Sequence, residues 1–215
     1  MPPKYRKRPD LLLLLSLLLI ILTGPELDHG KIRQLLLAAL MFVPVVLASV
    51  RLSEIKGWVW PSILLALGSL VFSIASGISR TPALQATKWV FLAAFFAVSV
   101  VGLFSHLRNP SAVTEEHLYT AVNIYLLLGM TWFALYSTFD TLRPGSILHA
   151  KGNGGDSELL YFSLVTLATI GYGDVVPVHP EVRILAALEG ITGVLYIAIT
   201  VALLVSSFRR QNNYR

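Results

Sequence analysis

Long apolar runs without charge divide this sequence. A chain that is 55% hydrophobic and 13% charged departs in both directions from a soluble domain, which is about 45–50% apolar and about 25% charged. Charged or helix-breaking residues bound six runs, at residues 11–22, 35–50, 58–76, 88–106, 117–139 and about 184–208. A helix needs roughly 20 mostly apolar residues to cross a bilayer. The sequence therefore predicts an all-α membrane protein with six transmembrane helices.

A further apolar run, residues 159–170, is too short to cross a bilayer and is followed by Gly171-Tyr172-Gly173. It lies between the fifth and sixth predicted spans. Non-helical backbone at membrane depth is tolerated only where it lines a cavity or is buried in protein. We therefore expect a re-entrant helix that leads into a functional loop.

Composition excludes several other classes of protein. The 17 Lys and Arg residues give a net charge of +5, but they form no basic stripe with interleaved aromatics, so we expect no nucleic-acid partner. The absence of cysteine excludes disulfides and cysteine nucleophiles. Five histidines lie scattered without metal-ligand spacing, and no nucleophile elbow occurs. The sequence thus predicts no enzyme, no cofactor and no small-molecule substrate. The histidines are His29, His106, His117, His149 and His179.

The segment from Thr166 to Asp174 reads TLATIGYGD. It resembles the selectivity filter of potassium channels, written T-x-x-T-x-G-Y-G-D, and the surrounding helices resemble their pore domain. The likeness covers roughly the second half of the chain, whereas the first half resembles six-helix channels only in its number of helices. The resemblance implies passive conduction of K⁺ as the transported ion. Because one chain supplies a single filter strand and a ring of carbonyls needs four, it also implies a homotetramer.

The residues of this segment suit that chemistry. A dehydrated K⁺ needs oxygens in place of water, and successive backbone carbonyls turned the same way can supply them. Such a backbone alternates in handedness, and glycine reaches positive φ at little cost, which fits glycines at alternate positions. We expect Thr169, Ile170, Gly171 and Tyr172 to coordinate K⁺ and Gly173 to complete the filter. A glycine-rich turn on an outer loop is the alternative.

Aromatic and acidic residues are expected to support the filter. Tyr161 and Phe162 on the preceding helix are candidate aromatic neighbours of Tyr172. In some family members a pore-helix glutamate bonds to the filter aspartate, but Val165 stands at that position here. Asp174 must therefore find another partner, for which the Tyr161 hydroxyl is a candidate.

Two further acids have expected positions. Asp156 is predicted to be the N-cap of the short helix, with acidic residues in its first turn. Glu189 is an acid inside the last predicted span, where charge is costly. We expect it behind the filter, bonded to Ser163 or Thr166, in a structural role.

The last span also contains a candidate gate. Gly193 resembles the hinge glycine of family inner helices, with close helix packing through a small residue as an equal alternative. Val194, Ile197, Val201 and Val205 follow on one helical stripe. They are predicted to line the inner pore and close it by dewetting. Packing or contact with lipid is the alternative for this stripe.

Polar, helix-breaking residues at 108–111 predict a division of the chain into two parts. Residues 1–108 form a four-helix part. Residues 109–215 form a pore part with an outer helix at 117–139, a pore helix at 157–168, a filter at 169–174 and an inner helix at 183–208. The fourth helix has Lys88 and Arg108 at its ends and no charge between them, whereas a voltage sensor needs several spaced arginines or lysines. We expect weak voltage dependence, and no cytoplasmic regulatory domain after Phe208.

Orientation follows from the distribution of Lys and Arg, which favours a cytoplasmic amino terminus. Six spans then place both termini in the cytoplasm and the loop 140–181 outside, in a multi-pass protein of the plasma membrane. The first apolar run could also be a signal peptide, but Thr23-Gly24-Pro25 offers no cleavage site, so we expect it to be retained. Outside, protonation of His179 and, less strongly, His149 would reduce conduction in acid. The alternative is that both are solvated loop residues too far from the ion path to affect conduction.

A K⁺ carrier or transporter subunit, with the loop as an ion-binding station, remains the functional alternative. Carriers of that kind are expected to show internal repeats and broken helices. The sequence has neither feature, so a channel is favoured.

Overall fold

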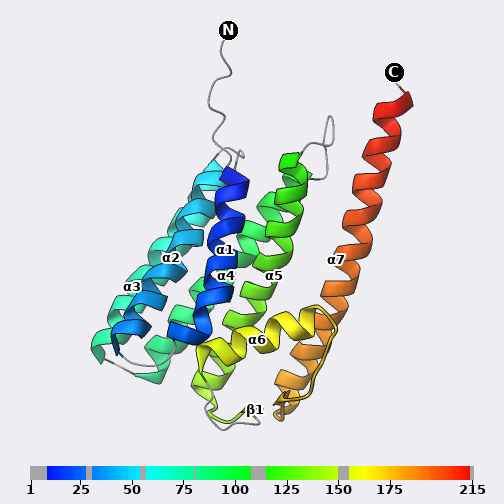
Figure 1. Ribbon diagram of the computed structural model, residues 1–215. Coiled ribbons are helices and arrows are strands. Elements are labelled where there is room, and N and C mark those ends of the chain that lie inside the picture. The colour runs from blue at the N-terminus through cyan, green and yellow to red at the C-terminus, as the bar shows by residue number, and fades with distance from the viewer. Residues whose placement is uncertain are drawn as a thin grey trace.

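The computed structural model describes residues 9–27, 31–53, 57–79, 81–107, 115–149 and 155–213. Helices dominate this part of the chain (Figure 1), which agrees with the all-α prediction. The elements, in order, are α1 (Pro9–Leu27), α2 (Lys31–Ser53), α3 (Val59–Ser79), α4 (Pro82–Leu107), α5 (Glu115–Leu142), β1 (Ile147–His149), α6 (Asp156–Leu167), β2 (Val175–Pro177) and α7 (Pro180–Asn213).

Among the described residues, four helices are long and apolar enough to cross a membrane. These are α3, α4, α5 and the Pro180–Ser206 part of α7. Helices α1 and α2 contain the shorter apolar segments Pro9–Thr23 and Phe42–Ser53. The protein is therefore an integral membrane protein.

Two of the predicted helices are shorter than the helices in the structure. Helix α5 extends beyond the predicted 117–139, and α7 extends beyond 183–208. Apolar runs mark the part of a helix that lies in hydrocarbon, and polar turns such as Glu115-Glu116 continue the helix past it. The short helix, predicted at 157–168, occupies residues 156–167.

Lys88 lies within α4, so its predicted position at the helix end is wrong. The helix begins at Pro82, because proline suits the first helical position, where its missing N–H has no helical partner. The Lys88 ammonium lies 3.9 Å from the centroid of the Trp89 ring. Arg108, at the other predicted end, lies outside the described residues.

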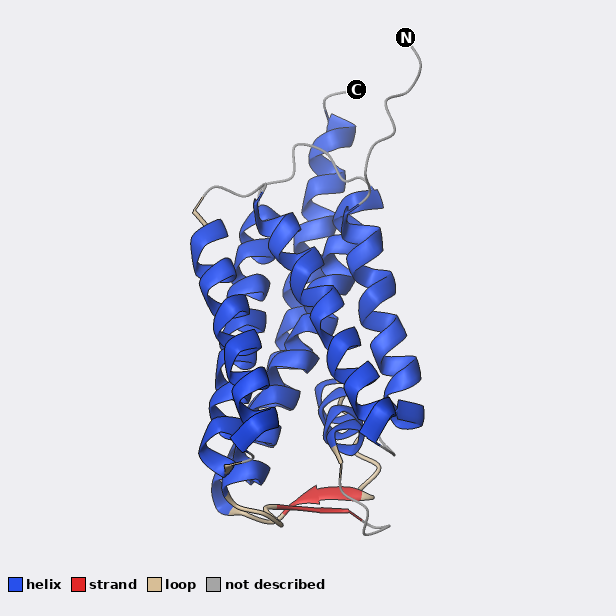
Figure 2. Cartoon of the chain, turned by 90° about the vertical axis from the view of Figure 1, so that its left-hand side faces the viewer, coloured by secondary structure: helices blue, strands red, loops and turns tan. Residues whose placement is uncertain are grey.

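The helices are arranged around α5. Helices α1 to α4 pack on one side of α5, and α7 lies on the other side (Figure 1). The short α6 lies across one end of the bundle (Figure 1), and the two strands lie at the same end (Figure 2). The start of α1 and the end of α7 lie at the opposite end of the molecule from the strands.

One hydrophobic core joins the two predicted parts of the chain. The Trp89 ring of α4 and the Phe133 ring of α5 pack in a T-shaped arrangement, with centroids 5.2 Å apart. Leu13 and Leu17 of α1 are fully buried in the same core, as is Val182 at the start of α7. The four-helix part therefore packs directly on the pore part within one chain.

The two short strands pair antiparallel and fasten the outer loop. Ile147 lies opposite Pro177, and His149 lies opposite Val175. The Val178 amide also donates to the Ser146 carbonyl at 3.0 Å. This pairing, which the sequence analysis did not anticipate, fixes the chain that leaves the candidate filter to the chain that leaves α5.

Candidate functional site

The site is built at the C-terminal end of α6. The helix is capped by the backbone of Gly155 in an extended conformation (φ −147°), without a side-chain cap bond. The prediction that Asp156 is the N-cap is therefore wrong, since Asp156 is the first helical residue. Asp156 and Glu158 instead place negative charge in the first turn, beside the positive end of the helix dipole.

The chain leaves α6 through a tight set of backbone bonds. The Thr169 amide donates to the Thr166 carbonyl at 2.9 Å, and the Ile170 amide donates to the Val165 carbonyl at 2.9 Å. Thr166 thus supports the loop through its backbone carbonyl. Because these carbonyls are satisfied locally, the loop begins in a fixed direction.

The loop alternates in backbone handedness. The φ angles are +57° at Thr169, +58° at Gly171 and +79° at Gly173. Positive φ therefore recurs at every second residue, which is the pattern that aims successive carbonyls to one side. Gly171 and Gly173 have the positive φ angles that their alternate spacing predicted. Coordination of an ion by this segment stays a prediction.

Thr169 is the residue whose conformation the sequence analysis missed. Among the described residues it alone has a positive φ without being glycine. A β-branched residue in that region is a genuine outlier, and such strain costs of order 1–3 kcal/mol and clusters at functional sites. The signal was present in the sequence, because the alternation set by the glycines extends back two residues to Thr169.

The loop is exposed on the surface of the single chain. The exposed fraction is 53% for Ile170 and 70% for Tyr172. Beside the loop, an open apolar groove is lined by Thr169 together with residues of α7. The α7 residues are Ala186, Ala187, Gly190, Ile191, Val194 and Leu195. Oxygens from this one strand can surround an ion on one side only.

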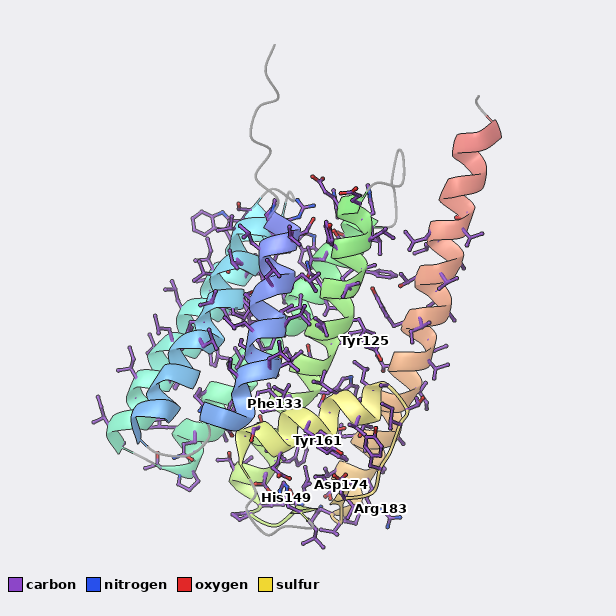
Figure 3. The ribbon with its side chains drawn as sticks, in the orientation of Figure 1. Tyr125, Phe133, His149, Tyr161, Asp174 and Arg183 are labelled. Carbon is purple, nitrogen blue, oxygen red and sulfur yellow. The ribbon has the colours of Figure 1, made fainter. Side chains whose placement is uncertain are left out.

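Asp174 is held by Tyr161 (Figure 3). The Tyr161 hydroxyl donates to Oδ2 of Asp174 at 2.8 Å, and the Val175 amide donates to Oδ1 at 3.1 Å. The hydrogen bond to Asp174 is the largest cause that raises the pKa of Tyr161 to about 12. The hydroxyl therefore keeps its proton at physiological pH and remains a donor. This is the partner that the sequence suggested in place of the absent glutamate.

Phe162 points into the core. Its ring packs against Tyr136 of α5 with centroids 5.0 Å apart, and the residue is buried. Consecutive helical residues point about 100° apart, so Tyr161 and Phe162 cannot both face the same neighbour. Phe162, one of the two candidate neighbours of Tyr172, therefore packs on Tyr136 instead and fixes α6 to α5.

Glu189 joins three helices behind the loop. The Ser163 hydroxyl of α6 lies 2.6 Å from Oε1, and the Tyr136 hydroxyl of α5 donates to Oε2 at 2.6 Å. Glu189 is fully buried. Ser163 was one of the two expected partners, whereas Tyr136 was not anticipated. The carboxyl group therefore fixes α7 to both α6 and α5.

Gly193 lies where α7 crosses the end of α6. A Cβ built on Gly193 would overlap the Leu167 carbonyl oxygen and lie 3.3 Å from the Leu167 Cδ1 atom. This geometry supports the close-packing interpretation of Gly193. Helix α7 is continuous from Pro180 to Asn213, so the hinge role stays a prediction.

Alanine at position 193 is expected to weaken the packing of α7 on α6. Overpacking a well-packed contact typically costs about 1–3 kcal/mol, and here the atom that must give way is backbone. We expect Gly193→Ala to lower the melting temperature of the purified protein. Gly190→Ala is the matched control, since its Cβ would lie 3.8 Å from the nearest atom, the Thr166 carbonyl oxygen. Equal melting temperatures for the two variants would contradict the close contact.

The predicted gate stripe lies on an uncovered face of α7. Val194, Ile197, Val201 and Val205 are each about half exposed, and Val194 lines the apolar groove. This chain alone therefore leaves the stripe free to contact another molecule, lipid or water. Its role in gating stays a prediction.

His179, the expected acid sensor, lies in a charged group at the start of α7. Its Nε2 atom is 3.0 Å from Nη1 of Arg143, and its Nδ1 atom contacts Glu181. Arg143 also donates to Glu181 at 3.2 Å. His149 lies apart from this group, with Nδ1 3.4 Å from Oε2 of Glu158. Sensitivity to external acid stays a prediction for both histidines.

The short helix α6 ends in a loop of alternating handedness and lies between α5 and α7, which is the order of elements expected from the resemblance to channel pore domains. Residues 120–210 match the family model described as "Ion channel". The match begins within α5 and includes α6, the loop and most of α7.

Three curated relatives are potassium channels. The inward rectifier potassium channel Kirbac3.1 of Paramagnetospirillum magnetotacticum is 32% identical over 84 residues, which is 39% of this chain and 25% of that protein. The potassium voltage-gated channel protein shk-1 of Caenorhabditis elegans is 39% identical over 56 residues, 25% of this chain and 10% of that protein. The two pore potassium channel c of Oryza sativa subsp. japonica is 30% identical over 99 residues, 46% of this chain and 20% of that protein.

The matched segment thus spans a quarter or less of the length of these relatives. No solved structure matches the chain. The comparisons confirm the recognition of a potassium-channel pore domain in the second half of the chain.

Proposed function

We propose that this protein is a potassium-selective channel that conducts K⁺ passively across the membrane. The observation that carries the proposal is the segment from Thr169 to Gly173, whose positive φ angles at alternate residues suit a row of carbonyls facing one side. Backbone carbonyls arranged in rings can replace the hydration shell of K⁺. Residues Thr169 to Tyr172 are proposed to coordinate the ion, with Gly173 completing the filter.

The proposed channel is a homotetramer. One chain supplies one strand of carbonyls, and the exposure of Ile170 and Tyr172 leaves this strand accessible to other chains. The apolar groove beside Thr169 and the half-exposed stripe of α7 add apolar surface on the same side. Four copies around one axis would cover these surfaces and close the rings.

We propose six crossings, with α1 and α2 spanning beside the four helices of sufficient length. Helices α1 and α2 run alongside α4 and α5 (Figure 1). The start of α1 and the end of α7 lie at the same end of the molecule, opposite the filter loop, as an even number of crossings requires. Both ends are then cytoplasmic in a plasma-membrane protein. Retention of α1 is supported by the burial of Leu13, Leu17 and Ile20 in the shared core.

Recording from purified protein in a planar bilayer under a K⁺/Na⁺ gradient tests the function. We expect unitary current steps that reverse close to the K⁺ equilibrium potential. A carrier gives no unitary steps, so a smooth K⁺-dependent flux would favour the carrier alternative. Steps that reverse near the Na⁺ potential would contradict potassium selectivity. Chemical cross-linking in the same membranes is expected to end at the tetramer.

Open probability is expected to vary weakly between about −100 and +100 mV, as for a protein in which few charges cross the field. In α4 the charged side chain is Lys88, which stacks on Trp89 near the outer end of the helix. We expect Lys88→Gln to leave the voltage dependence of open probability unchanged. A steep activation curve that flattens in this variant would show that α4 senses voltage.

A further inference from the structure

A buried polar cluster joins the four-helix part to the outer pore helix. It consists of Asp10 of α1, Arg51 of α2, and Thr120 and Asn123 of α5, and is called the Asp10 cluster below. Nε of Arg51 donates to Oδ1 of Asp10 at 2.9 Å. The Thr120 hydroxyl lies 3.1 Å from Oδ2 of Asp10 and 2.9 Å from the Glu116 carbonyl oxygen of its own helix, so its one proton is shared between these two acceptors. The Asn123 side-chain amide donates to the Asp10 backbone carbonyl at 2.8 Å. One residue of α1 thus accepts hydrogen bonds from two other helices.

The cluster is almost completely shielded from solvent. The exposed fraction is 2% for Asp10, 7% for Arg51, 1% for Thr120 and 0% for Asn123. A charge removed from water is costly, and a buried ion pair is tolerated only when hydrogen bonds satisfy both partners. Removing one partner leaves the other charge buried and uncompensated. The ion pair itself lies between α1 and α2, and α5 adds the neutral donors of Thr120 and Asn123. Movement of α5 away from α1 would deprive the buried Asn123 amide and Oδ2 of Asp10 of these bonds, which costs about 1–3 kcal/mol for each group.

The same turn of α5 is bonded to the inner helix on its other side. The Tyr196 hydroxyl of α7 donates to the Ala121 carbonyl at 2.5 Å. The ring of Tyr196 lies 5.8 Å from that of Tyr125, on the side of α5 that faces α7 (Figure 3). Tyr196 immediately precedes Ile197 of the predicted gate stripe. A single stretch of α5, from Thr120 to Tyr125, therefore contacts both α1 and α7.

We propose that the Asp10 cluster is a gating clamp. The cluster holds the first turns of α5 in place on α1. Because α5 cannot follow α7, any movement of α7 away from α5 must break the hydrogen bond from Tyr196 to Ala121. The clamp stabilises the conformation in which that bond is formed. Through it, a four-helix part without sensor charges sets the balance between open and closed pores. This inference rests on the proposed channel function.

The test uses three conservative variants of the full chain in planar bilayers. Thr120→Val removes a hydroxyl that bonds to Asp10, and Tyr196→Phe removes the hydroxyl that bonds to α5. Thr131→Val is the matched control, because the Thr131 hydroxyl donates to the Leu127 carbonyl of its own helix. We expect the first two to shift the ratio of open to closed time in the same direction, by at least about fivefold. The control is expected to shift it less than about twofold.

The double variant of Thr120 and Tyr196 measures the coupling. Independent sites give a double shift equal to the product of the single shifts within about twofold. We expect a double shift well below that product, because both changes release the same contact between α5 and α7. A multiplicative double shift, or no shift in Thr120→Val, would overturn the clamp.

Two measurements distinguish failure of the clamp proposal from failure of the proposed channel function. If wild-type protein passes no K⁺ current, the proposed function fails; if it conducts but Thr120→Val gates like wild type, only the clamp fails. Tetramer elution and an unchanged single-channel conductance show that each variant is folded. Asp10→Asn, which removes the charge facing Arg51, must shift the ratio in the same direction as Thr120→Val, and an opposite shift would equally overturn the proposal.

Discussion

Replacement of Gly173 by alanine is expected to abolish the preference for K⁺ over Na⁺. The φ angle of Gly173 is +79°, a region in which an L-residue loses roughly 1–2 kcal/mol. Relief of that strain turns the peptide unit and with it the carbonyls, and in a tetramer the change occurs four times around one ion. The measurement is the reversal potential with K⁺ on one side of the bilayer and Na⁺ on the other.

Gly145→Ala is the matched control for this prediction. Gly145 has a φ of +83° in the turn after α5, and as at Gly173 no atom lies within 4 Å of a Cβ built there. The local backbone strain is therefore similar, but the site is outside the loop. We expect this control to keep the wild-type reversal potential. If Gly173→Ala also kept it, Thr169 to Gly173 would not be the filter.

Removal of the Glu189 carboxyl group is expected to have the second large effect. In Glu189→Ala the buried Tyr136 hydroxyl loses its partner, whereas the Ser163 hydroxyl keeps the Gly129 carbonyl oxygen at 2.8 Å. A buried polar group left without a partner costs about 1–3 kcal/mol, and the cavity left by the removed side chain adds to this loss. Because these bonds fix α5, α6 and α7 to one another, we expect a lower melting temperature and a marked loss of K⁺ conductance.

Glu181→Gln distinguishes this network from a general effect of acid removal. Glu181 lies on the same helix, and its side chain is 53% exposed at the outer surface. We expect the melting temperature of this variant to stay close to that of wild type, since exposed ion pairs contribute about 0–1 kcal/mol. Equal losses of stability in Glu189→Ala and Glu181→Gln would show that the buried network is not what holds the helices.

The sequence predicted the parts of the molecule that depend on local chemistry. Glycines at alternate positions lead directly to positive φ at Gly171 and Gly173, because backbone sterics act within a residue. Apolar runs located each long helix, because every backbone group in hydrocarbon must be satisfied within the segment. Ends of helices were less accurate, as at Lys88, because hydropathy locates the membrane and not the last turn.

Contacts between distant segments could not be predicted in the same way. The bond from Tyr136 to Glu189 spans 53 residues, and the pairing of β1 with β2 depends on how α5 and α7 are placed. Asp10 was passed over because it stands beside the first apolar run and looks like its polar boundary. The sequence did contain a signal for this contact: Asp10 adjoins the first apolar run, and Arg51 directly follows the second. An acid and a base at the ends of two neighbouring membrane segments indicate an ion pair between them.

The positions of the Asp10 partners along the chain bear on biosynthesis. Arg51 lies 41 residues from Asp10, whereas Thr120 lies 110 residues from it. A ribosome adds about 5–20 residues per second, so the hairpin of α1 and α2 reaches the insertion machinery seconds before α5 exists. The acid can therefore be neutralised by its arginine as the hairpin enters the lipid. The later arrival of α5 then adds uncharged donors to a pair already formed, and no lone charge has to wait in hydrocarbon for the pore to be made.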